Sequence, residues 1–299
     1  MMYTDLALEA AELRTRELAP QGKLDGVVSR RETRRGFTLD RVEILDARGA
    51  ALLEKPQGRY VTLDIGAAVG HDPDAFLRAC TLTASLLREL LPEGNGGALV
   101  AGLGNRDLTP DAIGPACVKN VFVTRHMRAA MPELFERYRP VCAAAPGVLG
   151  TTGIETAEYL RALVDKLRPD FVIAADALMA RRMNRLCTTV QITDTGVAPG
   201  SGLGGKSAKL DREYLGVPVI ALGVPTIVDS ATLAIDTMHD AGLRDLDEDA
   251  LRREGGGMIV TPKEIDRLGS VCAKLLGYAI SLALHEDLTI EELETLVGT

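Results

Sequence analysis

Between residues 97 and 222, short apolar segments alternate with stretches of helical periodicity. Apolar runs of this length are typical of buried strands, and their alternation with helices is typical of parallel strand pairs. The sequence therefore predicts an α/β fold with a largely parallel sheet covered by helices. The expected strands are residues 60–65, 97–102, 141–145, 170–175, 188–192, 217–222 and 258–260. The expected helices are residues 7–18, 74–91, 156–167 and 262–284, with two more starting near residues 109 and 178.

No linker or repeat divides the 299 residues, so we expect one domain over residues 1–299. Residues 1–40 are charged and, apart from the short helix, predict irregular structure. Residues 230–257 are expected to be peripheral, and the acidic, glycine-containing stretch 240–257 predicts a surface loop.

The composition excludes several classes of function. A net charge of −8, 4% aromatic residues and no Trp argue against a nucleic-acid partner. Five cysteines without a C-x-x-C pair indicate a reducing compartment, and neither a signal-peptide layout nor a membrane-length apolar run is evident. We therefore expect a cytoplasmic protein without a membrane partner. The basic residues Arg30, Arg31, Arg34 and Arg35 predict a solvated surface run, with contact to an acidic peptide as the alternative.

Several motifs suggest a site but lack its context. Gly200–Ser207 fits the phosphate-loop pattern G-x4-G-K-S, but a loop containing Pro199 separates it from the strand that ends near Ile192. We therefore expect a glycine-rich loop, and nucleotide binding is the alternative. Asp194-Thr195-Gly196 is the active turn of all-β aspartic proteases, a fold class that this pattern does not match. The four histidines have no ligand spacing, so we expect no metal and no cofactor.

Two aspartates follow predicted strands. Asp176 comes directly after the apolar run 171–175, and Asp111 lies at a helix start just past the strand 97–102. Since sites of open α/β sheets lie at the carboxyl ends of strands, both acids are expected at one sheet edge. Two close carboxyl groups share a proton, so one can activate water while the other protonates the substrate. The alternatives are a helix-dipole residue for Asp111 and a helix cap for Asp176.

Taken together, these segments resemble the germination protease family, the endopeptidase of spore-forming bacteria. The resemblance runs in order through residues 4–10, 41–46, 102–105, 109–115, 123–126, 145–147, 152–156, 170–178, 188–196, 223–229 and 260–266. Its most specific parts are Thr109-Pro-Asp-Ala-Ile-Gly-Pro115 and Asp170-Phe-Val-Ile-Ala-Ala-Asp-Ala-Leu178. No single segment is decisive, but their joint occurrence is specific.

The resemblance implies an atypical aspartic peptidase whose two catalytic aspartates are Asp111 and Asp176. It implies a twisted sheet with helices on both sides, similar to the hydrogenase-maturation peptidases, and a homotetramer. The implied substrates are the small acid-soluble spore proteins, cut after the acid in Thr/Ser-Glu-apolar-Ala motifs, which would place the protein in the spore core. Glu155, Asp194 and Asp229 are expected to support the two aspartates from around the site.

The N-terminus resembles such a substrate, because Thr4-Asp5-Leu6-Ala7 repeats the motif. The family implies a zymogen that cuts itself at the matching place, between Asp5 and Leu6. Residues 1–5 would then be a residual propeptide, so short that zymogen control is weak or lost. The sequence departs from the family at Arg106, where an aromatic residue is usual, and between Asp229 and Met258, which is shorter.

Two alternatives remain at the level of mechanism. One is a metal-assisted peptidase with Asp111, Asp176 and either Asp194 or Glu155 as ligands. The other is a non-catalytic binding protein on the same scaffold, which the presence of both aspartates and of the self-cleavage motif disfavours.

Overall fold

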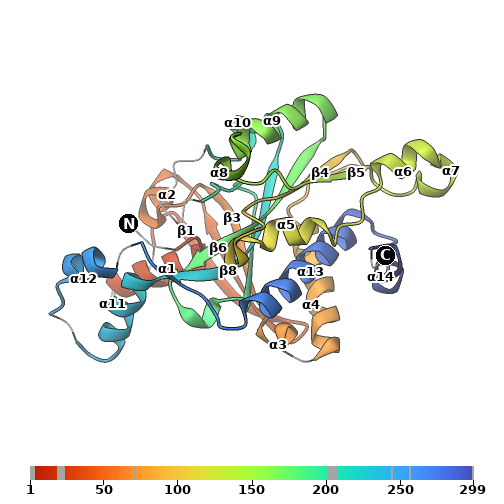
Figure 1. Ribbon diagram of the computed structural model, residues 1–299. Helices are drawn as coiled ribbons and strands as arrows, with labels where there is room; N and C mark the ends of the chain where they lie inside the picture. Colours follow the sequence, from red (N-terminus) through yellow and green to blue (C-terminus); the bar gives the residue numbers. More distant parts are fainter. Residues whose placement is uncertain are drawn as a thin grey trace.

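The computed structural model describes residues 4–18, 24–70, 72–200, 208–243, 245–255 and 257–297. Within these ranges the chain forms one nine-stranded mixed sheet flanked by helices (Figure 1). The strands are β1 (Val27–Arg34), β2 (Phe37–Ile44), β3 (Gly58–Asp64), β4 (Ala98–Gly102), β5 (Val141–Ala144), β6 (Phe171–Ala180), β7 (Thr189–Thr193), β8 (Val219–Asp229) and β9 (Ile259–Val260). Their order is β1-β2-β3-β7-β8-β6-β4-β5, and β9 pairs with β8.

The helices lie between and after these strands. They are α1 (Ala7–Glu17), α2 (Ala47–Leu53), α3 (Gly66–Val69), α4 (Pro73–Arg88), α5 (Ile113–Val118), α6 (Arg125–Ala130), α7 (Pro132–Phe135), α8 (Leu149–Thr152), α9 (Thr156–Leu167), α10 (Arg212–Leu215), α11 (Ser230–Asp240), α12 (Glu248–Gly255), α13 (Ile265–Leu284) and α14 (Ile290–Val297). Two 3₁₀ turns, η1 (Thr109–Asp111) and η2 (Met183–Arg185), complete the set.

The sheet is parallel in only one half, which corrects the expectation of a largely parallel sheet. The pairs β4–β5, β4–β6 and β6–β8 are parallel. The pairs β1–β2, β2–β3, β3–β7, β7–β8 and β8–β9 are antiparallel. The alternation of strands and helices was recognised correctly between β4 and β6, where helical crossovers make parallel pairing possible. Outside that part, neighbouring strands run in opposite directions and pair antiparallel, because no helical crossover brings them back in the same direction.

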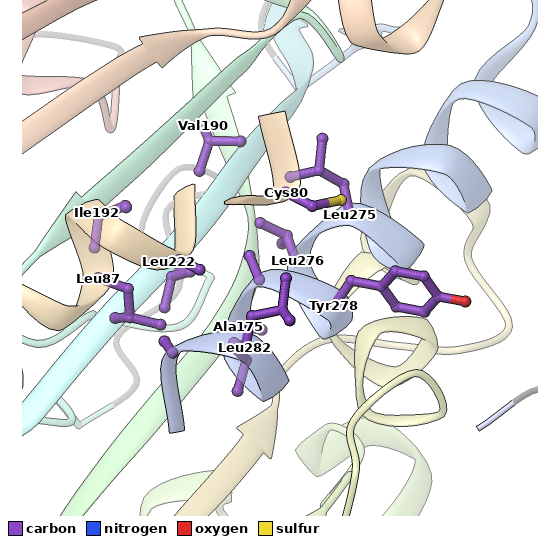
Figure 2. Packing of buried hydrophobic residues seen from close by; sticks show 14 of the residues in the cluster. Cys80, Leu87, Ala175, Val190, Ile192, Leu222, Leu275, Leu276, Tyr278 and Leu282 are labelled. Atoms are coloured by element: carbon purple, nitrogen blue, oxygen red, sulfur yellow. The ribbon is translucent and has the colours of Figure 1, made fainter. Parts of the chain in front are cut away.

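Both faces of the parallel half are covered by helices because alternate residues of its strands point to opposite sides. On one face α4 and α13 pack on the sheet, where Leu87, Leu276 and Leu222 belong to the same buried cluster (Figure 2). On the other face, Leu160 and Val164 of α9 pack with Leu99 of β4. Helix α1 covers the antiparallel half, packing against β2 and β3.

The N-terminal hairpin was not expected from the sequence. Strands β1 and β2 pair antiparallel from Val27–Ile44 to Arg34–Phe37. β1 is exposed along almost its whole length, so its sequence carries no apolar alternation. Arg30, Arg31 and Arg34 lie on this edge strand, and Arg35 lies in the turn that follows it. Arg31 pairs with Asp40 at 2.7 Å and Arg34 with Glu89 at 2.8 Å.

Three further elements differ from the expectations. β6 continues through Asp176 to Ala180, and no helix starts near residue 178. Helix α13 begins at Ile265 rather than at residue 262, and the Thr261 hydroxyl before it bonds the Thr226 carbonyl. Residues 240–257 are not a plain loop, because α12 forms within them. Helix α13 is long and apolar enough to cross a membrane, but 67% of its apolar window is buried, as in the core helix of a globular protein.

Candidate active site

The first candidate residue, Asp111, is placed by the tight connection after β4. Gly104 has φ +107°, and a Cβ at this position would collide with the carbonyl oxygen of Asp111, so only glycine fits. The Asn105 N–H donates to Asp111 Oδ2 at 2.7 Å. Asp111 ends η1 and does not start an α-helix, and no side-chain cap is formed by Thr109. The connection therefore holds the carboxylate at the end of β4.

The second candidate, Asp176, lies inside β6 rather than after it. Ala175 pairs with Gly102, the last residue of β4, whereas Asp176 pairs with Gly223 of β8. Asp176 is thus the first β6 residue beyond the end of β4, where the loop carrying Asp111 begins. Its side chain is 5% exposed. Both acids lie near the end of β4. Asp176 is not at the end of its own strand, however, because β6 and β8 extend past β4.

The surroundings of the two aspartates raise the pKa values of their carboxyl groups to different extents. Burial raises the pKa of Asp176 well above its ordinary value, and the neighbouring carboxylates of Asp111 and Asp5 raise it further. Burial also raises the pKa of Asp111, but the Asn105 N–H opposes this by stabilising the ionised form. Of the two carboxyl groups, Asp176 therefore has the larger upward shift in pKa and keeps its proton to the higher pH.

Both aspartates line a cleft of about 830 Å³. Its walls come from the end of β6, from β7 and β8, and from the loop between α2 and β3. Thr193, Thr195 and Tyr60 line one wall and are linked by hydroxyl contacts of 3.0 and 3.2 Å. The cleft therefore offers an acid, a base and a wall of polar groups.

The chain's own N-terminal segment lies in this cleft. Thr4 and Asp5 line it, whereas Leu6 and Ala7 are fully buried. The Asp5 N–H donates to the Met179 carbonyl at 2.8 Å, and the Met179 N–H donates to Asp5 Oδ2 at 2.7 Å. These bonds attach Asp5 alongside the part of β6 that continues past β4, so the predicted self-cleavage site lies in the same cleft as both aspartates and near Asp176.

Two side chains that were not predicted hold this segment. Gln191 of β7 donates to the Asp5 carbonyl at 3.1 Å and accepts from the Ala7 N–H at 2.8 Å. Lys55 Nζ donates to the Thr4 carbonyl at 2.8 Å. The position of Gln191 between two apolar residues of a predicted strand could have drawn attention to it. No sequence signal indicated Lys55, which comes from a loop distant in the chain.

The three residues expected to support the aspartates have different surroundings. Asp194 accepts from the N–H and Nε of Arg59 at 2.8 and 2.7 Å and so fastens the start of β3 to the end of β7. Asp229 lines the cleft but also caps α11 through Thr232. Glu155 precedes α9 and does not line the cleft.

The phosphate-loop lookalike is placed only in part. Gly200 borders the cleft, whereas residues 201–207 lie outside the described residues. Val197 and Leu210 form an isolated bridge on either side of this stretch. The motif is thus preceded by a cleft-lining turn after β7, whereas in a phosphate loop the strand leads directly into the motif.

Comparisons with known proteins show which family the chain resembles. A family model described as germination protease matches residues 7–241. Germination proteases from Clostridium perfringens (strain 13) and Caldanaerobacter subterraneus are each 41% identical to this chain, covering 97% and 98% of it and 97% of each relative. The germination protease of Bacillus subtilis (strain 168) is 35% identical over 97% of this chain and 95% of its own.

Proposed function

Because this chain belongs to the germination protease family and is therefore a protease of spore germination, we propose that it is the endopeptidase that starts the degradation of small acid-soluble spore proteins. It cuts after the acid of Thr/Ser-Glu-apolar-Ala motifs with a pair of aspartates. The observation that carries this proposal is the buried Asp176 beside Asp111, in a cleft that also receives the motif-like Thr4–Asp5.

In the proposed reaction the two aspartates have distinct roles. The Asp111 carboxylate takes a proton from water while the water oxygen attacks the carbonyl carbon of the acidic residue. The protonated Asp176 gives its proton to the carbonyl oxygen. As the tetrahedral intermediate collapses, the C–N bond breaks and the amine leaves with the proton that Asp111 had taken, while the oxygen returns its proton to Asp176. Both groups then have their starting protonation.

We propose the same chemistry for self-cleavage between Asp5 and Leu6. The location of Thr4 and Asp5 in the cleft supports it. Since Leu6 and Ala7 belong to the buried start of α1, the new N-terminus would remain attached after the cut. The protein would thus lose the residues up to Asp5 without losing the helix that covers the antiparallel half of the sheet.

A metal-assisted reaction is the alternative for the same acids. Within the described ranges, no three His, Cys, Asp or Glu side chains are arranged so that they could hold a metal ion. Asp194 is engaged by Arg59, and Glu155 is outside the cleft, so the ligands expected to complete such a site are not assembled. This favours the two-aspartate mechanism.

The proposal is tested with a peptide containing Thr-Glu-Ile-Ala. Wild type should cut it after Glu, and Asp111→Asn and Asp176→Asn should each lower kcat by at least about 10³-fold, because each removes a proton-transfer group while keeping its shape. Asp165→Asn, an exposed change on α9, is the matched control and should cut like wild type.

The outcomes separate the alternatives. Loss of wild-type activity with a chelator, restored by added metal, would support metal assistance. Wild-type rates in both dyad variants would place catalysis elsewhere. A folded wild type that cuts neither the peptide nor a small acid-soluble spore protein would favour the non-catalytic binding protein.

Three further expectations stay proposals. We propose a homotetramer, testable by light scattering, and a location in the spore cytoplasm. We also propose a fold relationship with the hydrogenase-maturation peptidases, which the helices on both faces support.

A further inference from the structure

The cleft has an excess of negative charge. Apart from the protonated Asp176, its acids are Asp5, Glu54, Asp111 and Asp229, and its cations among the described residues are Lys55 and Lys209. An acidic substrate side chain entering such a cleft is repelled unless a cation lies near its place. Lys209 pairs with Asp211 at 2.9 Å. Lys55 is therefore the cleft cation that can meet an incoming acid.

Lys55 is aimed into the cleft by the turn after α2. Leu53 is fully buried and anchors this turn, and Glu54 has a left-handed conformation with φ +51°. The Lys55 N–H bonds the Ala50 carbonyl at 3.2 Å, which closes the turn. A fixed backbone means that the lysine loses less freedom when it engages a ligand.

In this structure Lys55 contacts the backbone of the chain's own N-terminal segment, next to the acidic residue Asp5. Its Nζ donates to the Thr4 carbonyl at 2.8 Å, which is the carbonyl immediately before Asp5. Burial lowers the pKa of Lys55, while attraction to Asp5, Glu54 and Glu9 opposes this and favours the charged form. A cation is thus located one peptide unit from the residue that precedes the predicted cut.

We propose that Lys55 is a specificity-determining residue that selects an acidic side chain immediately before the cut and holds the preceding substrate carbonyl. The inference rests on the proposed peptidase function and names the group responsible for its acidic preference. Asp111 and Asp176 carry out the hydrolysis, and Lys55 determines which peptide bond is cut.

The test compares two peptides that differ only in charge, Thr-Glu-Ile-Ala and Thr-Gln-Ile-Ala, on the full chain. Wild type should prefer Glu by about 10- to 100-fold in kcat/KM, as expected of a partly buried charge-assisted contact. Lys55→Met should abolish most of this preference. Lys55→Arg should retain it, and Lys166→Met, on the exposed surface of α9, should match wild type.

The Glu-to-Gln ratio distinguishes selection from a structural role. A general loss of folding or backbone holding lowers both rates together and leaves the ratio unchanged, so an unchanged ratio in Lys55→Met overturns the inference. A wild type that cuts both peptides equally overturns it as well, while the peptidase function stands. A wild type that cuts neither overturns the peptidase function together with the inference.

Discussion

The side-chain amide of Gln191 donates to the carbonyl oxygen of Asp5 at 3.1 Å. With its own oxygen it also accepts from the N–H of Ala7 at 2.8 Å, so one side chain bonds the backbone on both sides of Leu6. This holds the peptide bond proposed for self-cleavage in a single position in the cleft that both aspartates line. Reacting groups held in this way react faster because less freedom is lost on the path to the transition state.

We expect Gln191→Leu to slow the cut between Asp5 and Leu6 by about tenfold or more, the effect of losing about 1.4 kcal/mol of positioning. The measurement is the N-terminal mass over time. Thr189→Val is the control, because Thr189 lies on the same face of β7 and its buried hydroxyl has no partner among the described residues. Equal rates in both variants would mean that the amide does not position the bond.

Glu9 anchors the same segment from the other side. Its carboxylate accepts from the Arg181 and Arg182 N–H groups at 2.6 and 3.0 Å and from the Thr4 hydroxyl. Glu9→Gln replaces one acceptor oxygen with an amide donor facing a buried donor, so it should lower the free energy of unfolding by about 1–3 kcal/mol. Urea unfolding measures this. Glu17→Gln, exposed on the same helix, should change it by less than about 0.5 kcal/mol, and similar values for both would contradict the anchoring role.

The sequence alone predicted the helices and strands that are marked by a pattern within their own residues. Helix α9 begins and ends at the predicted residues, and the short strands β4 and β5 lie within one residue of theirs. The hairpin β1–β2 was missed because β1 is an exposed edge strand without apolar alternation. The end of β6 was misplaced because an aspartate in an apolar run was read as the end of the strand, whereas a neighbouring strand buries it here.

For the site, the strand pattern predicted Asp111 and Asp176 as a pair but not what surrounds them. Only Asp111 follows a strand end, and Asp176 lies in the same cleft because β6 continues past the end of β4. The contacts of Lys55 and Gln191 with residues 4–7 depend on pairing across more than 50 and 180 positions. Such pairing is decided by tertiary packing and leaves no periodic pattern in one sequence.

Gly104 should be necessary for the geometry of Asp111. Gly104→Ala introduces a Cβ that collides with the Asp111 carbonyl, in addition to the strain of a positive φ. We expect peptide cleavage to fall by about 10²-fold, since displacing a catalytic group by about 1 Å has that effect. Gly94→Ala is the matched control, with φ +98° but nothing within 4 Å of the added Cβ. If both variants retain full activity, the turn does not position Asp111.

The proposed roles of the aspartates predict a bell-shaped dependence of kcat/KM on pH. Activity should fall at low pH as Asp111 takes up a proton, at a pH above the ordinary aspartate value because burial raises its pKa. It should fall again at higher pH as Asp176 ionises. The two apparent pKa values belong to the pair, because the carboxyl groups interact. A flat profile across the range in which the protein stays folded would contradict the shared-proton mechanism.

The raised pKa of Asp176 also predicts how stability depends on pH. Below about pH 3.8 the residue is protonated in both the folded and the unfolded state and costs nothing. As pH rises from there towards the folded-state pKa, only the unfolded state loses the proton, so the folded state is disfavoured by about 1.4 kcal/mol for each pKa unit. Asp176→Asn removes this titration.

The variant should therefore be more stable than wild type at neutral pH, and the difference should shrink as pH falls towards 4. Urea unfolding at a series of pH values measures it, with exposed Asp165→Asn as the control that should follow wild type throughout. A stabilised but inactive Asp176→Asn would mean that the carboxyl group is retained for chemistry at the expense of stability. If the variant is less stable than wild type at neutral pH, burial of Asp176 does not carry the cost that its surroundings indicate.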